Sequence, residues 1–381
     1  MQQHEQGNHG WSVVHESMAL LAGSGSAPTV DRLLESVRRT RPRMSTSHLI
    51  TLLGIALRTV AAQAPRAEAL FSPELSAAER ATLLSQTLEE HHDRITAVLT
   101  GRSNSFTGAR RFLIPQLLLS SYAAHHAVDA IRLLDMGTGI GLLLRQLNNR
   151  VVFDRFAPDL EWSPRQPPYR TIPLVERHGI DAPPLPTLEW IRACHGPSAY
   201  YDERFSEVLW SLEQTASADT AADTSPVISA LDILDLPALA GYLRTHRINV
   251  VTCNFVFYQY DEATRREVIA TIKEALAPPG LLLSMEPRDG LRRMGARVEA
   301  HLTGGIGSTG PLHVADVSDA HVLGRATAGP GFTELTGLAG SETSAWNGPP
   351  EPAEPAEPAV PGEPGEPGEP GGPGVPDGMG R

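Results

Sequence analysis

Four residues near the middle of the chain have the types and spacing of a ligand-binding turn: Asp135, Gly137, Gly139 and Gly141. The apolar residues 131–134 predict a strand before this turn, and residues 142–147 predict an apolar helix after it. A strand that ends in glycines and leads into a helix creates a tight turn at which a ligand approaches the backbone closely. The dinucleotide fingerprint needs its third glycine at the position of Leu142, so the spacing disfavours a nucleotide-dependent oxidoreductase.

Side chains that can transfer a proton occur further along the chain, and they are His195, Tyr258, Tyr260 and Glu286. Tyr258 follows a predicted strand, and a packed aromatic is its alternative interpretation. His195 stands beside Gly196 and Pro197 at the predicted end of a helix. These residues are candidates for a general base, and the elements around them decide whether they reach the turn.

The first third of the sequence predicts helices. Apolar residues recur at helical spacing within 30–37, 50–57 and 83–88. Ser76, with Glu79 three residues later, has the form of a capping box at the start of the third helix. Strand signals are nearly absent before residue 128, so we expect a helical domain at 29–127 after a flexible N-terminus at 1–28.

From residue 131 onward, strands alternate with helices. After the first strand, residues 151–153, 227–231, 248–254 and 280–285 predict strands, and residues 262–276 predict a helix. Residues 157–186 are rich in Pro and Arg and predict an irregular excursion, 188–212 a helix and 215–224 a loop. Residues 313–317 and 321–324 are expected to form a closing antiparallel pair. The fold class is therefore α/β, with a doubly wound, mostly parallel sheet at 128–335.

The bulk composition restricts the partners and the location. The formal charge is -12 over 381 residues, and about half of it lies in the Glu-Pro-Gly-rich segment at 336–381, which we expect to be a disordered tail. An acidic chain disfavours nucleic acid as a partner. No apolar run is long enough to span a bilayer and no signal peptide is apparent, so a cytoplasmic protein is expected. Cys194 and Cys253 are too isolated for a disulfide framework or a zinc knuckle.

Two motifs together resemble a known superfamily. Residues 135–141 resemble the acid-x-Gly-x-Gly-x-Gly loop of class I (Rossmann-like) S-adenosylmethionine (SAM) dependent methyltransferases. Residues 249–258, the helix at 265–276, the Pro-Pro-Gly turn at 278–280 and Glu286-Pro287 resemble the fourth strand, helix and fifth strand of that superfamily. The helical front, Asn104 with Arg110 or Arg111, and the segment Arg177-x-Gly-x-Asp181 make the overall layout similar to an uncharacterised bacterial family of this fold.

The resemblance implies SAM as the cofactor and assigns contacts to eight residues: Asp135, Gly137, Thr138, Gly139, Gly141, Asp154, Asp232 and Asn254. Asp232 resembles the acid that meets the adenine amino group, and Asp235 offers the same chemistry. Methyltransferases of this class usually place an acid at the end of the second strand to hold both ribose hydroxyls. Asp154, after the predicted strand at 151–153, is the candidate for that role, with Glu161 as the alternative.

The acceptor side depends on fewer signals. Arg177, Asp181 and Tyr258 are the candidates for binding the acceptor, while Arg177 and Asp181 have the alternative role of pinning the excursion to the core. The paired histidines at 91–92 and 125–126 point in different directions on a helix, so we expect no metal site.

The expected function is methyl transfer to a small-molecule acceptor, with oxygen as the preferred atom. The alternative is a non-catalytic SAM-fold protein that senses a ligand or binds a partner. We expect no nucleic-acid and no membrane partner, and we leave a homodimer open.

Overall fold

The computed structural model describes residues 28–72, 74–196, 199–219, 225–288, 295–305 and 310–339. These residues belong to one compact unit, Met1–Glu342. Residues 1–27 of the predicted flexible N-terminus and 340–381 of the predicted tail lie outside the described residues. The domain boundaries at 29–127 and 128–335 stay predictions.

The helical front contains the helices expected there. They are α2 (Pro28–Thr40), α3 (Thr46–Ala61), α4 (Pro65–Glu68), η1 (Ala69–Phe71), α5 (Ala77–Glu90) and α6 (His92–Gly101). The capping box is confirmed, because Ser76 accepts from the Glu79 N–H and the Glu79 side chain accepts from the Ser76 N–H. Apolar residues of α2, α3, α5 and α6 share one buried cluster, which Trp190 joins.

The rest of the described chain forms a nine-stranded sheet in the order β2-β9-β8-β7-β6-β5-β1-β3-β4. The strands are β1 (Ile131–Met136), β2 (Leu160–Ser163), β3 (Leu174–Asp181), β4 (Val227–Ala230), β5 (Val250–Asn254), β6 (Gly280–Pro287), β7 (Ala296–Thr303), β8 (Leu312–Val317) and β9 (Gly324–Ala328). Strands β4, β3, β1, β5 and β6 are parallel, whereas β7, β8 and β9 continue the sheet as an antiparallel meander. Strand β2 pairs in parallel with β9 at the edge.

The parallel strands reverse their order at β1. The chain runs from β1 outward through β3 to β4, then returns to the other side of β1 for β5 and β6. This is the doubly wound arrangement, and its switch point lies at the carboxyl end of β1, where such folds bind ligands. Asp135 is aligned there with Gly179 of β3 and Thr252 of β5.

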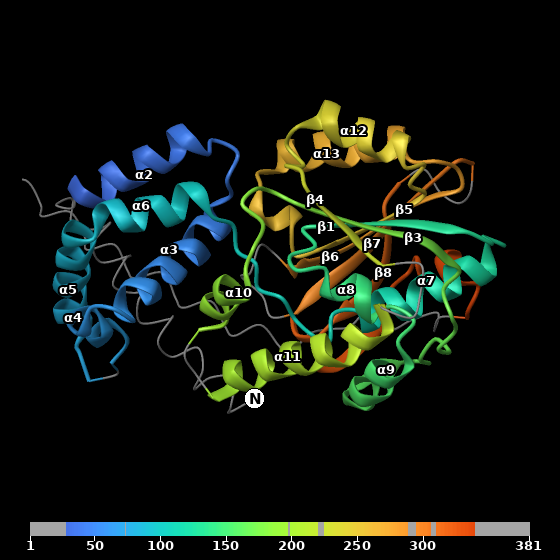
Figure 1. Cartoon of the computed structure of the whole chain (residues 1–381), viewed down its shortest axis with the longest axis horizontal. Helices are drawn as coiled ribbons and strands as arrows, with labels where there is room; N and C mark the ends of the chain where they lie inside the picture. The colour runs from blue at the N-terminus through green and yellow to red at the C-terminus, as the bar shows by residue number, and fades with distance from the viewer. Residues whose placement is uncertain are drawn as a thin grey trace, which may run out of the picture. The chain divides into compact units, whose positions relative to one another are not determined.

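Helices cover both faces of the sheet, as Figure 1 shows. On one face lie α12 (Leu236–Thr245) and α13 (Glu262–Ala275), whose apolar residues share a cluster with β1 and β5. On the other face pack α7 (Leu113–His125), α8 (Leu142–Gln146), α9 (Arg150–Phe156) and α14 (Phe332–Thr336). The α10 (Leu188–His195) and α11 (Ala199–Asp219) helices follow the excursion, and η2 (Ala157–Asp159) and η3 (Phe257–Gln259) are short 3-10 turns. The predicted α/β fold is confirmed.

The strand predicted at residues 151–153 is wrong, because these residues lie in α9. Asn149 caps the helix by accepting from the Val152 N–H, and the buried residues Val152, Phe153 and Phe156 follow helical rather than alternating spacing. A run of three apolar residues is too short to distinguish the two periods.

The irregular excursion predicted at 157–186 is also wrong in part, because it contains β2 and β3. Strand β3 lies inside the parallel sheet, yet Glu176, Arg177 and His178 interrupt the apolar run that such a strand usually has. Arg132 pairs with Glu176 and Tyr242 with His178, and these neighbours make the polar residues acceptable there.

Three boundaries differ from the sequence expectation. The helix predicted at 188–212 is two helices separated at Gly196, and α11 continues to Asp219, into the predicted loop. The closing antiparallel pair exists as β8 and β9, with its second strand at 324–328 instead of 321–324.

Candidate functional site

The glycine turn after β1 has the backbone that only glycine adopts easily. Gly137, Gly139 and Gly141 all have positive φ, at 66°, 61° and 73°. A Cβ at Gly137 would lie 2.3 Å from Val256 Cγ2, and one at Gly141 would lie 2.8 Å from Ile228 Cδ1. At Gly139 the nearest neighbour would be Thr107 Oγ1, at 3.3 Å. Two glycines are therefore required by packing, while Gly139 faces the cleft.

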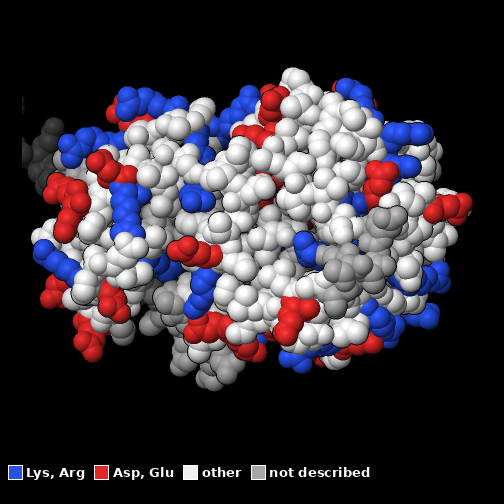
Figure 2. Space-filling model, in the orientation of Figure 1, with Lys and Arg blue, Asp and Glu red and all other residues white. Residues whose placement is uncertain are grey.

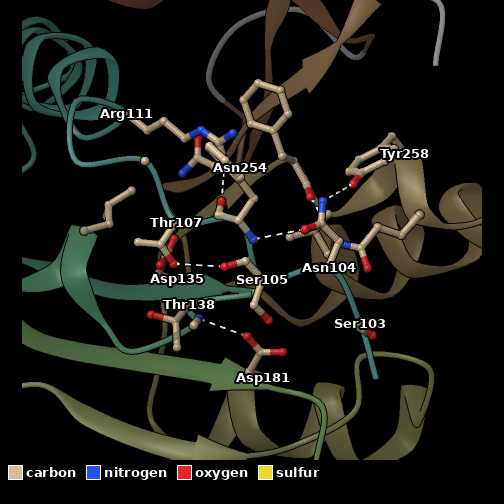
Figure 3. Close-up of a pocket in the computed structure, with 18 of the residues that line it drawn as sticks. Ser103, Asn104, Ser105, Thr107, Arg111, Asp135, Thr138, Asp181, Asn254 and Tyr258 are labelled. Atoms are coloured by element: carbon tan, nitrogen blue, oxygen red, sulfur yellow. Dashed lines mark hydrogen bonds between the residues drawn. The ribbon is translucent and has the colours of Figure 1, made fainter. Parts of the chain in front are cut away.

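This cleft, which we call the main cleft, collects residues from the ends of several strands. It is lined by the turn residues Gly137, Thr138 and Gly139, by the acids Asp135 and Asp181, and by Asn254 and Tyr258. Residues 103–108 cross the cleft opposite the turn (Figure 3). The sequence-predicted residues Asp135, Gly137, Thr138, Gly139, Asp181, Asn254 and Tyr258 are thus brought together.

Asp135 is buried at the end of β1 and accepts a hydrogen bond from Thr252 Oγ1 at 2.8 Å. Burial raises the pKa of this carboxyl to about 7 against the opposing effect of its hydroxyl donors, and the nearby Asp181 raises it further. A carboxyl with this pKa changes charge near neutrality, so it responds strongly to a positive ligand.

Asp181 ends β3, which is the second strand of the doubly wound sheet. Its two carboxylate oxygens accept from the backbone N–H groups of Gly139 at 2.9 Å and Ala182 at 2.8 Å. Burial raises the pKa of this carboxyl. Asp181 therefore lies at the end of the second parallel strand, which is the position for which Asp154 was the sequence-based candidate.

Asp154 lies elsewhere, on α9. Its carboxylate pairs with Arg150 at 2.8 Å on an exposed helix surface, and it does not line the cleft. Glu161, the alternative candidate, is an exposed residue of edge strand β2. Neither residue lies at the cleft: Asp154 belongs to a helix instead of the predicted strand, and Glu161 lies on a strand at the edge of the sheet.

A second pocket adjoins the main cleft on the side of β4. The two share Ser103, Ser105, Asp181, Ala182 and Tyr260. Asp232 lines this adjoining pocket from the turn after β4, together with Arg41 and Trp190. The Asp232 carboxylate accepts from the Leu234 N–H at 2.9 Å, while Asp235 caps α12 instead.

Asn254 and Tyr258 line the cleft beyond β5. The Asn254 Nδ2 group is buried and has no hydrogen-bond partner among the described residues. Tyr258 Oη accepts from Asn104 Nδ2 at 2.8 Å (Figure 3). Burial raises the pKa of the Tyr258 phenol to about 12, so the phenol stays protonated at neutral pH.

Glu286 does not line the main cleft, but it fixes the backbone of residues 256–258 beside the cleft. The carboxylate accepts from the backbone N–H groups of Val256, Phe257 and Tyr258, each at 3.0 Å. Burial raises the pKa of this carboxyl to about 7 despite these donors. Its position supports a structural role in placing Tyr258.

His195 and Arg177 do not line the cleft either. His195 is buried at the end of α10, stacks on Phe106 with 4.1 Å between ring centroids, and lies with Nδ1 2.9 Å from the Ile191 carbonyl oxygen. Burial lowers the pKa of this imidazole to about 4. Arg177 donates to the Leu144 carbonyl oxygen at 3.3 Å, which fits the role of pinning β3 to α8.

One end of the main cleft is lined by Phe106, Tyr201 and His321, which no sequence motif indicated. The three rings contact one another, with centroids 5.0 Å apart for Phe106 and His321. Arg111 also lines this end and lies over the Phe255 ring, with 3.9 Å between guanidinium carbon and centroid. Among the sequence motifs, only Asn104 with Arg110 or Arg111 includes a residue at this end of the cleft.

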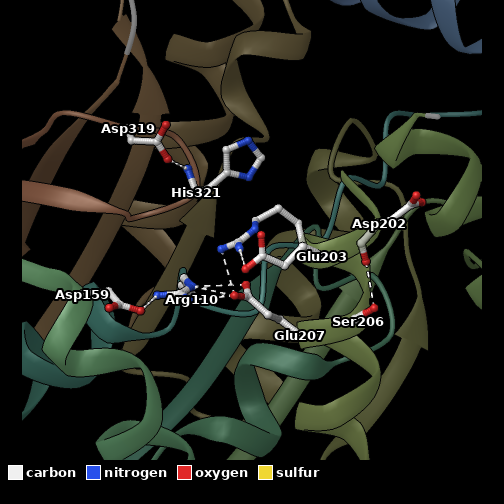
Figure 4. Close-up of polar contacts among 9 residues, drawn as sticks. Arg110, Asp159, Asp202, Glu203, Ser206, Glu207, Asp319 and His321 are labelled. Carbon is white, nitrogen blue, oxygen red and sulfur yellow. Dashed lines mark hydrogen bonds and ion pairs between the residues drawn. The ribbon is translucent and has the colours of Figure 1, made fainter. Parts of the chain in front are cut away.

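A buried ion network supports the helix that carries Tyr201. Glu207 of α11 accepts from Arg110 at 2.7 Å and forms an ion pair with Arg204 at 2.8 Å, and Arg110 also pairs with Asp159 (Figure 4). Arg110, Arg204 and Glu207 are buried, so removing Glu207 would leave two buried guanidinium groups without this partner and destabilise the fold. The Asp319 carboxylate accepts from the His321 N–H at 2.7 Å and so fixes the turn that carries His321.

The surface of the described residues carries charges of both signs. On the face shown in Figure 2, acidic and basic side chains are interspersed. Among the described residues, no helix is long and apolar enough to cross a membrane.

Solved structures with related chain traces include methyltransferases. The rRNA methyltransferase aviRa from Streptomyces viridochromogenes aligns with a TM-score of 0.28 and 13% identity, over 49% of this chain and 83% of that one. An O-methyltransferase family protein from Burkholderia thailandensis aligns with a TM-score of 0.28 and 16% identity, over 63% and 56%. PKMT2 from Rickettsia typhi in complex with AdoHcy aligns with a TM-score of 0.22 and 14% identity, over 48% and 25%. The chain spans less than two thirds of the latter two, and the fold class rests on its own strand order.

No curated protein matches the chain. A family model described as an uncharacterized protein conserved in bacteria (DUF2332) matches residues 27–328. Because this match spans most of the sequence, including the glycine turn and all of the parallel strands, the chain belongs to that bacterial family.

Proposed function

We propose that this chain is a SAM-dependent methyltransferase that acts on a small-molecule acceptor. The observation that carries the proposal is the meeting of Gly139, Asp181 and Asp232 at the carboxyl ends of the first three parallel strands. The doubly wound fold binds ligands at this switch point. SAM, when bound, supplies an electrophilic methyl group on a positively charged sulfur.

The residues present fit an adenosyl group. The Asp181 carboxylate lines both the main cleft and the adjoining pocket, so it can accept hydrogen bonds from two ribose hydroxyls. Asp232 lies further along the adjoining pocket, where it can accept from an adenine amino group. Gly139 lets a ligand approach the turn, because only Thr107 lies near its missing Cβ.

The methionine part of the cofactor fits the main cleft. Asp135 offers a carboxyl to a positive group, and the buried Asn254 amide offers a donor that the described residues leave unused. Among the described residues that line the main cleft, Arg111 is the only arginine or lysine. Its guanidinium provides positive charge for a carboxylate.

The acceptor then lies at the end lined by Phe106, Tyr201 and His321. Methyl transfer is an in-line displacement, so alignment and exclusion of water supply much of the rate. Transfer to oxygen also requires a base when the acceptor is a hydroxyl. His321 is the only histidine among the described residues lining the cleft, and we assign it that role ahead of His195, Tyr258 and Glu286.

The test is calorimetric titration of the full chain with SAM and S-adenosylhomocysteine (SAH). Wild type is expected to bind both in the micromolar range, and Gly139→Arg is expected to abolish binding by filling the cleft. Gly241→Arg is the matched control, because a Cβ at Gly241 meets nothing within 4 Å and this position on α12 is exposed.

The outcomes separate the alternatives. Failure of folded wild type to bind either ligand overturns the proposal. If SAM binds but none of its labelled methyl group is transferred to any of a panel of hydroxyl acceptors, the non-catalytic alternative is supported instead. Circular dichroism of each variant establishes that it is folded.

A further inference from the structure

A second cluster of polar side chains lies outside both pockets, where β3 meets the end of α12. Glu176 and His178 are two residues apart on β3 and so point to the same face of the sheet. His246 caps the carboxyl end of α12, which covers that face (Figure 1). One carboxylate oxygen and one nitrogen from each imidazole all lie within 4.8 Å of one another.

His178 is held in the orientation of a ligand by a second contact. Its Nδ1 lies 3.0 Å from Tyr242 Oη, and its Nε2 lies 3.1 Å from Glu176 Oε2. With the proton on Nδ1 and donated to Tyr242, the Nε2 lone pair points toward the carboxylate. Metal-binding histidines usually donate their other ring N–H in this way, which fixes the tautomer and the ring.

Glu176 is supported in the same manner. Its Oε1 accepts from Arg132 Nε at 3.1 Å, which leaves Oε2 for the cluster. An ionised carboxylate with one oxygen already anchored is a suitable ligand.

His246 completes the set. Its ring centroid lies 4.5 Å from that of His178 and 4.4 Å from that of Tyr242. In a tetrahedral zinc site with bonds of about 2.0 Å, neighbouring ligand atoms are about 3.3 Å apart. The His178–Glu176 distance of 3.1 Å already meets this requirement, and the half-buried His246 side chain, whose ligand atom lies within 4.8 Å of both, has to move closer.

We infer that Glu176, His178 and His246 form a binding site for a divalent transition metal, with zinc the best match. Two imidazoles and one carboxylate suit Zn²⁺, and they leave a fourth position for water. Glu176 is partly exposed, with 42% of its side chain accessible, so the ion reaches the site from solvent. The paired histidines at 91–92 and 125–126, where the sequence disfavoured a metal, take no part in the cluster.

The ion would link two elements that adjoin the acids of the two pockets. Strand β3 ends at Asp181, and α12 begins after Asp232. The site lies in the middle of β3 and at the carboxyl end of α12, and its three residues line neither pocket, so zinc would fasten α12 to β3 without entering the cleft. The expected role is structural support, independent of whether the chain transfers methyl groups.

The experiment titrates ZnCl₂ into the metal-free full chain by calorimetry, with thermal unfolding measured in parallel. Wild type is expected to bind one Zn²⁺ in the micromolar range or tighter and to melt at a higher temperature with zinc than without. His246→Ala and Glu176→Gln are each expected to weaken binding at least about 10-fold, and Tyr242→Phe to weaken it by about 10-fold through the lost hydrogen bond.

His313→Ala provides the matched control. His313 Nε2 lies 2.9 Å from Asp316 Oδ2, so the substitution removes a histidine–carboxylate pair that has no third ligand among the described residues. This variant is expected to bind zinc as wild type does. The inference is overturned if folded wild type binds no zinc below millimolar concentration, or if His246→Ala and Glu176→Gln bind as tightly as His313→Ala. Cobalt substitution gives a second readout, because visible d–d bands report four-coordinate nitrogen and oxygen ligation.

Discussion

The carboxylate of Asp181 accepts a hydrogen bond from the backbone N–H of Gly139 at 2.9 Å. The two residues are 42 positions apart in the sequence, and the pairing of β1 with β3 brings them together. This contact joins the glycine turn to the acid at the end of the second parallel strand. It gives the proposed cofactor site its geometry before any ligand is present.

Substitution of this acid tests the ribose assignment. Asp181→Asn is expected to weaken the binding of both SAM and SAH by about 10-fold or more, because hydrogen bonds to a charged group contribute about 1.5–3 kcal/mol. Asp154→Asn is the matched control, since its carboxylate is exposed and pairs with Arg150 on α9. Calorimetric titration of both variants measures the difference. Equal affinities would show that Asp181 is not the ribose acid.

The raised pKa of Asp135 predicts a pH dependence of binding. Below its pKa of about 7 the carboxyl is protonated and neutral, and above it the carboxylate attracts a positive ligand. The affinity for SAM is therefore expected to rise about 10-fold between pH 6 and pH 8, because binding to the ionised form releases one proton. Asp135→Asn should flatten this profile. A wild-type profile as flat as that of the variant would contradict the assignment.

Glu286 predicts a pH dependence of stability. Its pKa is raised from 4.5 in the unfolded chain to about 7 in the fold, so the folded state keeps a proton that the unfolded state releases. The contribution of Glu286 to the free energy of unfolding therefore falls as the pH rises from about 4.5 to 7. Glu286→Gln is expected to reduce this fall, measured by urea unfolding at pH 5, 6 and 7. An unchanged slope in the variant would show that Glu286 is ionised throughout.

The choice of base is tested by comparing two side chains of the cleft. His321→Asn is expected to lower methyl transfer to a hydroxyl acceptor by about 100-fold or more while SAH binding changes little, since general bases contribute about 10²–10⁴-fold. Tyr258→Phe is expected to lower it less than about 10-fold, because the phenol, with a pKa of about 12, is a poor acceptor of protons at neutral pH. The measurement is turnover against pH at saturating SAM. If Tyr258→Phe lowers turnover more than His321→Asn does, Tyr258 and not His321 is the general base.

The glycine turn shows what local sequence determines. The positive φ angles at Gly137, Gly139 and Gly141 follow from residue type, and the apolar runs on either side predict the strand and the helix. The capping box at Ser76 and the strands β5 and β6 were predictable for the same reason. Each depends on interactions among residues a few positions apart.

The position of Asp181, the acid proposed to bind ribose, depends on strand order, which is not a local property. The three apolar residues before Asp154 form a helix because Asn149 caps it, whereas β3 pairs with β1 although polar residues interrupt it. Partners distant in sequence, such as Arg132 and Tyr242, make that strand stable. Periodicity within a segment contains no information about such partners.

Tertiary structure also decided which of the candidate proton-transfer residues reach the cleft. His195 is buried and Glu286 half-buried outside it, and His321, which no motif indicated, lines it from the turn before β9. The sequence by itself determined the α/β class, the glycine turn and most of the helices, because short-range spacing specifies them. Only the packed sheet determined the acid beside the turn and the rings at the end of the main cleft where we propose that the acceptor binds, because contacts between distant segments place those side chains.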